Sequence, residues 1–283
     1  MNSHLHSSLY TTMIDIHCHI LPGIDDGASD VEESLKMARF AEQDGVKTII
    51  ATPHVFRPPF IHKNLFHIQD KWSEFSALLK ANNIQVDLLL GSEVHFVHNL
   101  IDVLKINYPY FGLNRGSYMI VEFPSNHVFS GVKQLFFDLT SRGLNLIIAH
   151  PERNSVFVRD PGLLYELIKM GVYVQANSGS FSSFYGTQTK EAAFRFLEWN
   201  FYHFLASDSH GKHKRSTRLS KAFRKIQELA GDEMALALVE YNPKAVVEDR
   251  EISLFKDPIN PTKKKKTFFV KIPNFSKGKL GRL

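Results

Sequence analysis

Short apolar segments alternate with longer amphipathic segments along most of this chain. In the longer segments the apolar residues recur at helical spacing, whereas the short ones have the length of buried strands. Such alternation is typical of β/α units arranged around a parallel sheet. The pattern therefore predicts an α/β fold with parallel strands.

The first β/α unit shows the pattern most clearly. Asp30-Val31-Glu32-Glu33 resembles a capping box that begins a helix, and Gly45 is placed to end it. An apolar strand at 48–51 follows this glycine. The same reasoning predicts further strands at 86–90, 118–121, 144–149, 172–175 and 204–206. Helices are expected to fill most of the intervening segments.

Side chains able to ligate a metal lie close to the ends of successive predicted strands. They are His17, His19, Asp26, His54, Glu93, Glu122, His150, Asp208 and His210. Strand carboxyl ends open on one face of a parallel barrel, and residues two apart on a strand share a face, as His17 and His19 would. Imidazole and carboxylate together suit Mn, Fe or Zn. We therefore expect a multi-metal catalytic cluster.

The chain contains fourteen histidines, and we exclude nine of them from the metal set. The excluded residues are His4, His6, His62, His67, His95, His98, His127, His203 and His213. Each of them lacks either a strand-end position or a carboxylate companion in the sequence.

Composition narrows the class of protein. With 283 residues, 43% of them hydrophobic, the chain suits one large α/β domain. The single cysteine, Cys18, excludes an intramolecular disulfide and fits a reducing compartment. Neither a secretory signal nor an apolar run of about 18 residues is visible. A soluble, cytoplasmic protein is expected.

The charge of the chain is concentrated at its C-terminal end. Residues 256–283 carry nine Lys or Arg against one Asp, a local balance of +8, which leaves −3 of the total +5 for residues 1–255. We therefore divide the chain into an N-terminal extension (1–12), a catalytic domain (13–255) and a basic tail (256–283). The composition of the tail is typical of a solvated terminus, or of a segment that contacts an anionic membrane or an acidic partner peripherally. No motif indicates nucleic-acid binding, and none is expected.

Six motifs together resemble one known superfamily. They are DIHCHILPGIDDGA, ATPH, GSEVH, VEFP, AHPERN and ASDSHG, in this order between about Met13 and Asp249. They are similar to those of the PHP (polymerase and histidinol phosphatase) superfamily, and within it to the manganese-dependent protein-tyrosine phosphatases of bacterial capsule and exopolysaccharide systems. The resemblance implies a distorted (β/α)7 TIM-like barrel, with the metal site at the C-terminal ends of the strands.

The resemblance also implies roles for the candidate residues. It places a first metal on His17, His19, Glu93 and Asp208, a second on Glu93, Glu122 and His150, and a third on Asp26, His54 and His210. Mn²⁺ is the expected metal, with Fe or Zn as alternatives. Arg153 and Arg215 match phosphate-binding arginines, and guanidinium groups grip phosphate bidentately.

The implied activity is metal-dependent hydrolysis of phosphotyrosine. The implied substrate is the phosphorylated C-terminal tyrosine cluster of a membrane-associated bacterial tyrosine kinase that regulates capsule or exopolysaccharide synthesis. Another PHP phosphoesterase, such as a histidinol-phosphate phosphatase, remains an alternative, as does a phosphotyrosine-binding scaffold without activity. A thiol-based phosphatase is disfavoured, because the C-x5-R pattern from Cys18 would need arginine at the position of Ile24.

Overall fold

The structure is a computed structural model that describes residues 12–61, 65–97, 99–107, 110–211, 216, 218–252 and 256–263. Three features expected from the sequence lie outside this description: residues 1–11 of the N-terminal extension, residues 264–283 of the basic tail, and Arg215. None of the helices in the described parts of the chain is both long enough and apolar enough to cross a membrane.

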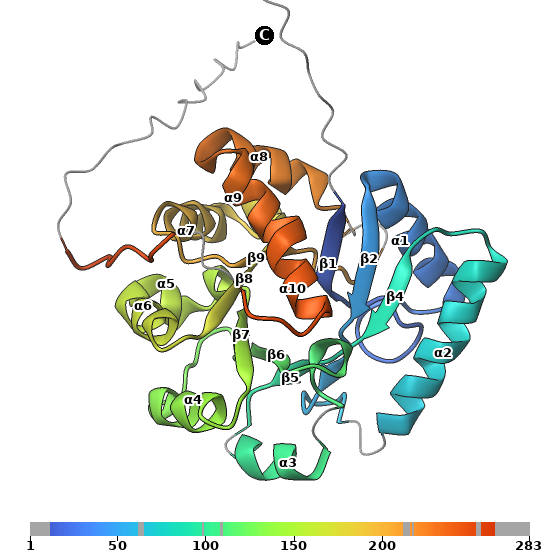
Figure 1. The fold of residues 1–283 in the computed structure, drawn as a ribbon, viewed down its shortest axis with the longest axis horizontal. Helices are drawn as coiled ribbons and strands as arrows, with labels where there is room; N and C mark the ends of the chain where they lie inside the picture. The colour runs from blue at the N-terminus through green and yellow to red at the C-terminus, as the bar shows by residue number, and fades with distance from the viewer. Residues whose placement is uncertain are drawn as a thin grey trace, which may run out of the picture.

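Parallel strands form the centre of the molecule (Figure 1). Within the described residues these are β1 (Met13–Cys18), β2 (Val46–Ala51), β3 (His54–Val55), β4 (Asp87–Leu90), β5 (Glu93–His95), β6 (Tyr118–Glu122), β7 (Asn145–Ala149), β8 (Tyr173–Asn177) and β9 (Phe204–Ala206). One sheet has the order β1-β2-β4, and the other has the order β3-β5-β6-β7-β8-β9. The predicted α/β fold with parallel strands is confirmed.

The two sheets are not closed by a continuous ladder into the expected barrel. β2 and β3 are separated by Thr52 and Pro53, and proline has no N–H to donate to a ladder. Between β9 and β1 the described residues show one isolated bridge, Cys18 to Ser209, instead of a ladder. The short strands β3 and β5 were missed from the sequence, because two or three residues are too few to show periodicity.

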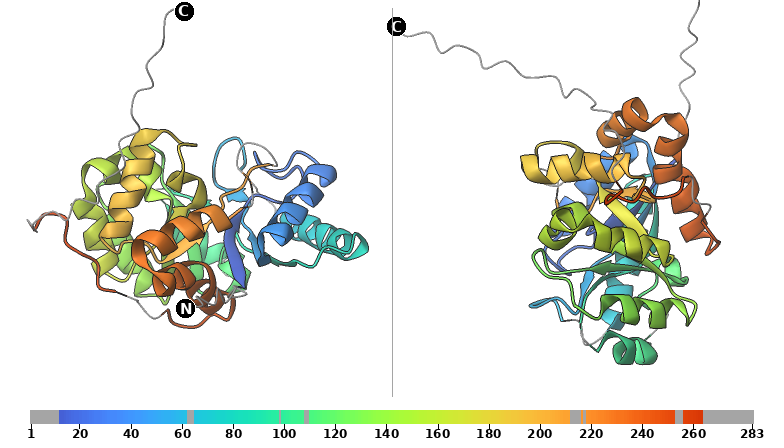
Figure 2. Two further views of the ribbon diagram at one scale, coloured as in Figure 1. Left: turned by 90° about the horizontal axis from the view of Figure 1, so that it is seen from above. Right: turned by 90° about the vertical axis from the view of Figure 1, so that its left-hand side faces the viewer.

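Helices lie on the outside of the strands (Figures 1 and 2). They are α1 (Val31–Asp44), α2 (Leu65–Ala81), α3 (Leu100–Asn107), α4 (Val132–Thr140), α5 (Ser155–Arg159), α6 (Pro161–Lys169), α7 (Thr187–Glu198), α8 (Ser220–Ala230), α9 (Asp232–Leu236) and α10 (Asn242–Val247). Short turns of helix are η1 (Leu113–Arg115), η2 (Pro151–Arg153), η3 (Ser178–Phe181) and η4 (Ala237–Tyr241). In Figure 1, α1 and α2 flank one sheet, and α4 to α7 flank the other.

The first helix begins and ends where its sequence predicts. The Asp30 side chain accepts a 2.9 Å hydrogen bond from the Glu33 backbone N–H, and Gly45 ends α1 with φ of 94°. Glu33 in turn accepts a 3.1 Å hydrogen bond from the backbone N–H of Ser29. The Asp30 cap therefore fixes where the ligand-bearing loop ends and α1 begins.

The apolar core consists of two clusters on the two faces of the strands. The larger one fills the space between the strands and the outer helices. The smaller one joins residues such as Ile14, Ile50, Ile120 and Phe204 to Val246 of α10. These strand residues precede the carboxyl ends of their strands. The smaller cluster therefore packs beneath the polar side chains at those ends.

Candidate metal centre

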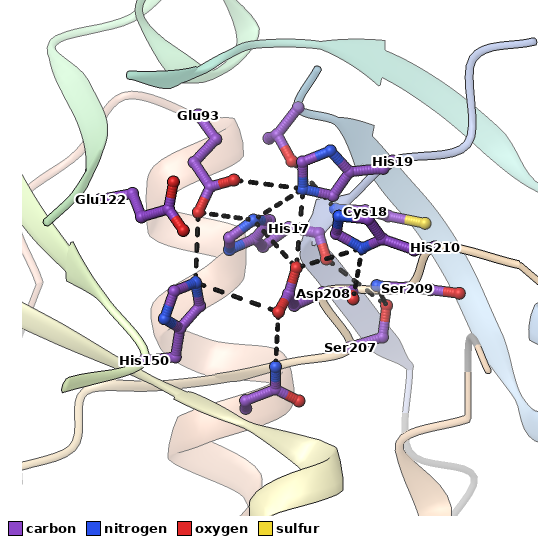
Figure 3. A network of polar contacts seen from close by, with 12 residues as sticks. His17, Cys18, His19, Glu93, Glu122, His150, Ser207, Asp208, Ser209 and His210 are labelled. Atoms are coloured by element: carbon purple, nitrogen blue, oxygen red, sulfur yellow. Dashed lines mark hydrogen bonds and ion pairs between the residues drawn. The ribbon is translucent and has the colours of Figure 1, made fainter. Parts of the chain in front are cut away.

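The nine side chains expected to ligate metal gather at the carboxyl ends of the strands. They come from β1 and the loop after it (His17, His19, Asp26), from the starts of β3 and β5 (His54, Glu93), and from the ends of β6, β7 and β9 (Glu122, His150, Asp208, His210). Figure 3 shows seven of them pointing toward one another. Segments almost 200 residues apart in the chain thus meet at one point.

Glu93 lies at the centre of this group. Its Oε1 is 3.3 Å from His17 Nε2 and 3.2 Å from His150 Nε2, and its Oε2 is 3.2 Å from His19 Nε2 and 2.9 Å from His54 Nδ1. Burial alone would raise the pKa of this carboxyl, but the surrounding imidazoles hold it well below its usual range. The side chain therefore stays a carboxylate with an oxygen facing each side of the centre.

Asp208 forms a second junction. Its Oδ1 lies 3.7 Å from His17 Nε2, 3.6 Å from His19 Nε2 and 3.4 Å from His210 Nδ1. The Asp208 backbone is left-handed, with φ of 48°, and its N–H donates to the His17 carbonyl over 2.8 Å. This turn directs the carboxylate into the centre directly after β9.

Asp26 joins two imidazoles at the outer edge. Its Oδ1 is 3.2 Å from both His54 Nε2 and His210 Nε2. Burial opposes ionisation, but His210 and His54 lower the pKa of Asp26 far below its usual range. The carboxylate is 40% exposed, so this edge of the centre opens to solvent.

Among the described residues, three sets of ligand atoms lie close enough to hold metal ions. The sets are His19, Asp26, His54 and His210; His17, His19 and Asp208; and His54, Glu93 and Glu122, each within 4.8 Å. This grouping differs from the one that the resemblance implies, because His19 joins the Asp26 set and His54 joins the Glu93 set. His150 contacts Glu93 but is outside all three sets.

The donor chemistry fits divalent cations. His54 Nδ1 and Glu93 Oε2 are buried and, among the described residues, neither makes a hydrogen bond, although they lie 2.9 Å apart. Burial lowers the pKa of His54, yet Glu93 and Asp26 raise it to about 9. Imidazole nitrogens and carboxylate oxygens gathered in one small volume are donors that divalent cations such as Mn²⁺ or Zn²⁺ bind.

Two residues that the sequence did not single out orient the imidazoles. His19 Nδ1 donates to Asp25 Oδ2 over 2.7 Å, and His17 Nδ1 donates to Gln175 Oε1 over 3.0 Å. Both histidines therefore direct Nε2 into the centre. Burial raises the pKa of Asp25, but the His19 charge outweighs it and lowers the pKa to about 2. The two adjacent aspartates in the first motif, Asp25-Asp26, are the sequence feature that could have indicated the role of Asp25.

The edge of the centre includes two further side chains that sequence reasoning missed. Arg57 Nη1 lies 3.3 Å from Asp26 Oδ2 and also contacts His54. His95 Nδ1 lies 3.1 Å from Glu122 Oε2. His95 thus ends β5 and has a carboxylate companion on the neighbouring strand β6, although it belongs to none of the three ligand sets found among the described residues.

Arg153 stands beside the centre, as its distance of three residues from His150 suggested. Its Nη1 donates to Asp208 Oδ2 over 2.5 Å, and its guanidinium carbon lies 4.5 Å from the ring centroid of Tyr185. Arg153, His150 and Glu122 line a cavity of about 210 Å³. The other arginine expected here, Arg215, lies outside the described residues.

Comparison with known proteins identifies the family. A family model described as "Capsular polysaccharide synthesis, CpsB/CapC" matches residues 13–248. The chain belongs to the CpsB/CapC family. The tyrosine-protein phosphatase YwqE of Bacillus subtilis is 36% identical over 257 residues, which cover 90% of this chain and 99% of YwqE. The putative tyrosine-protein phosphatase CapC of Staphylococcus aureus is 32% identical over 75% of this chain and 82% of CapC.

Solved structures agree with this membership. One solved chain superposes with a TM-score of 0.82 at 35% identity, covering 88% of this chain and 99% of the other. It comes from the crystal structures of YwqE from Bacillus subtilis and CpsB from Streptococcus pneumoniae, which are described as unique metal-dependent tyrosine phosphatases. The CpsB/CapC chain is thus an enzyme of a metal-dependent tyrosine-phosphatase family, as the motifs predicted. A histidinol phosphate phosphatase from Lactococcus lactis, at 15% identity and a TM-score of 0.52, shares the fold alone.

Proposed function

We propose that this chain hydrolyses phosphotyrosine on a bacterial tyrosine kinase and thereby regulates capsule or exopolysaccharide synthesis. The observation that carries the proposal is the convergence of nine imidazole and carboxylate side chains next to Arg153 and an open cavity. The family description and the names of the relatives support the same activity and setting. The proposed substrate is the phosphorylated tyrosine cluster at the C-terminus of a membrane-associated kinase, reached from the cytoplasm.

We propose that Mn²⁺ ions occupy a three-metal cluster at the carboxyl ends of the parallel strands. His17, His19, Glu93 and Asp208 would hold one side of the cluster, and the remaining ligands would hold the other two positions. Bound cations would neutralise phosphoryl charge and make a water acidic enough to attack phosphorus at neutral pH. Fe and Zn suit the same donors, so the identity of the metal rests on the family resemblance.

The protein itself would bind and orient the phosphate. Arg153 carries a permanent charge and a planar set of donors, and Asp208 and the Tyr185 ring hold it at the wall of the cavity. We propose Arg153 and Arg215 as the phosphate-binding arginines. Asp25 and Gln175 would keep the Nε2 atoms of His19 and His17 unprotonated and aimed at the cluster.

The test compares initial rates on a phosphotyrosyl peptide, histidinol phosphate and single-stranded DNA. Protein is stripped of metal and reloaded with Mn²⁺, and metal content is measured alongside. We expect Mn-dependent turnover of the phosphotyrosyl peptide alone, and its loss in His150→Ala, because that imidazole contacts Glu93. His127, whose side chain is exposed, supplies the matched control His127→Ala.

Other outcomes would redirect the proposal. Metal-dependent turnover of histidinol phosphate alone would keep the centre and replace the substrate. A full metal complement without turnover of any of the three substrates, combined with binding of the phosphotyrosyl peptide, would establish a scaffold in place of an enzyme acting on phosphotyrosine.

A further inference from the structure

The cavity beside the metal centre has two kinds of wall. Glu122, His150 and Arg153 form its polar side, whereas aromatic side chains, Tyr185 among them, form much of the remainder. Its volume of about 210 Å³ far exceeds the share of one water molecule in the liquid, roughly 30 Å³. The space is thus suited to a group of several heavy atoms next to the phosphate-binding arginine.

Part of the aromatic wall belongs to the rigid core. Phe123 and Phe157 are 6% and 0% exposed, and their rings meet edge to face with centroids 5.8 Å apart. Asn154 fixes the start of α5 by accepting from the Val156 N–H over 2.8 Å and donating to the Pro124 carbonyl over 2.7 Å. This part of the wall is therefore preformed and does not depend on a bound substrate.

Tyr185 forms the outer part of the wall and connects it to the metal centre. Its ring lies against the guanidinium of Arg153, and its hydroxyl is 3.2 Å from Asn177 Nδ2. Asn177 Nδ2 also donates to Asp208 Oδ2 over 2.7 Å. Because Tyr185 is only half-buried, its ring retains surface that a ligand can cover.

We propose that Tyr185 and Phe123, with the buried Phe157 ring supporting Phe123, form the subsite that receives the aromatic ring of phosphotyrosine, with Tyr185 as its specificity-determining residue. The inference rests on the proposed phosphatase function and names the part of the site that selects its substrate. In phosphotyrosine a single oxygen joins the phosphorus to the ring, so a phosphate-binding arginine and a ring-binding wall must adjoin, as Arg153 and Tyr185 do. Aromatic pairs add about 0.5–1.5 kcal/mol beyond burial of area.

The proposal predicts discrimination between aryl and alkyl ligands. We would measure competitive inhibition by phenylphosphonate and by methylphosphonate, which share the charged group but differ in the ring. Tyr185→Leu removes the ring contact for phenylphosphonate alone, whereas any loosening of Arg153 affects both ligands. The inhibition constant of phenylphosphonate should therefore rise roughly 3- to 10-fold more than that of methylphosphonate, the equivalent of one aromatic contact. Tyr185→Phe keeps the ring and should leave both constants within about 2-fold of wild type.

Two further variants complete the design. Thr189→Met introduces a larger side chain at the cavity wall on α7 and should weaken phenylphosphonate more than methylphosphonate even if Tyr185→Leu folds poorly. Phe137→Leu, on the exposed face of α4 and outside the cavity lining, is the matched control and should change neither constant. Metal content is measured for every variant.

Each contrary result has a separate meaning. An equal rise of both inhibition constants in Tyr185→Leu would show that Tyr185 acts only by positioning Arg153, and no change in either would show that the ring binds elsewhere; both overturn the subsite. If the wild-type protein does not hydrolyse the phosphotyrosyl peptide, the proposed function is refuted instead. The two inhibition constants are then measured with another phosphoester as substrate.

Discussion

At the scale of the residue, the metal centre depends on hydrogen bonds to the far side of each imidazole. The Asp25 carboxylate accepts from His19 Nδ1 and also from the His54 backbone N–H, at 2.7 and 2.9 Å. One carboxylate thereby holds two ligand-bearing segments. Such outer contacts fix the tautomer and raise the basicity of the ligand nitrogen. Asp25 is therefore expected to influence metal affinity without touching the metal.

Replacing Asp25 by asparagine tests this role. Asp25→Asn removes the negative charge beside His19 and should weaken Mn²⁺ binding about 10- to 100-fold, measured by titration against a competing chelator. Asp30→Asn is the matched control, because Asp30 caps α1 and asparagine caps a helix equally well. An unchanged Mn²⁺ affinity in Asp25→Asn would contradict the role.

At the scale of the element, the pairing of β8 with β9 includes a buried histidine. His203 donates its backbone N–H to the Val174 carbonyl over 2.9 Å, and its Nδ1 accepts from the Val174 N–H over 3.1 Å. The imidazole thus substitutes for a backbone acceptor just before β9. Burial lowers the pKa of His203 to about 4, since an imidazolium there would lose solvation and could no longer accept at Nδ1.

This pairing predicts a pH dependence of stability. The unfolded chain takes up a proton at His203 below a pH of about 6.5, while the folded chain resists protonation down to a pH of about 4. The free energy of unfolding should therefore fall as pH decreases through this window, with His203 contributing up to about 3 kcal/mol of the loss. The free energy of unfolding is measured by urea titration of metal-stripped wild type and His203→Gln at pH 7 and pH 5. An identical decrease in both proteins between these pH values would exclude His203 as the cause.

At the scale of the whole molecule, the metal centre joins the two sheets. His17 lies in β1 of one sheet, Glu93 begins β5 of the other, and Asp208 follows β9. These carboxylates and imidazoles converge where the described residues show only one bridge between β9 and β1. Bound cations would hold together strand ends that the backbone leaves weakly paired, so folding stability and metal occupancy should be coupled.

Removing the metal should therefore lower the melting temperature. A ligand present at 100 times its Kd stabilises the folded state by about 2.7 kcal/mol, so chelation of Mn-loaded protein should give a clear decrease in Tm by calorimetry. Asp208→Asn should show a smaller difference between loaded and stripped protein than wild type. Equal Tm values for loaded and stripped wild-type protein would contradict the coupling.

The basic tail offers a second test at this scale. Its first residues contact the body, since the Ile259 N–H donates to the Trp199 carbonyl over 2.8 Å and Asn200 Nδ2 donates to the Asp257 carbonyl over 3.2 Å. A deletion should therefore begin at residue 264. We expect loss of binding to vesicles containing anionic lipid, at about 1 kcal/mol per basic residue, with turnover of a small aryl phosphate unchanged. Loss of that turnover would indicate a structural role instead.

Much of the fold and of the candidate centre follows from contiguous residues. The strand expected at 204–206 matches β9 (Phe204–Ala206), the one expected at 118–121 falls within β6 (Tyr118–Glu122), and Asp30 and Gly45 bound α1. Periodicity and capping act within a few residues, so these features are visible in the sequence. The same holds for the motifs at the strand ends, because parallel strands bring their carboxyl ends to one face.

Only the tertiary structure decided which side chains meet across that face. Gln175 reaches His17 from β8, and His95 finds its carboxylate on β6. Tyr185 comes to lie on Arg153 from a loop more than thirty residues away. The break after β2 likewise replaces the expected closed barrel by two sheets. Sequence by itself determined most of the elements and the candidate donors, because these depend on local spacing. The partners of those donors depend on distances between strand ends, which no local pattern specifies.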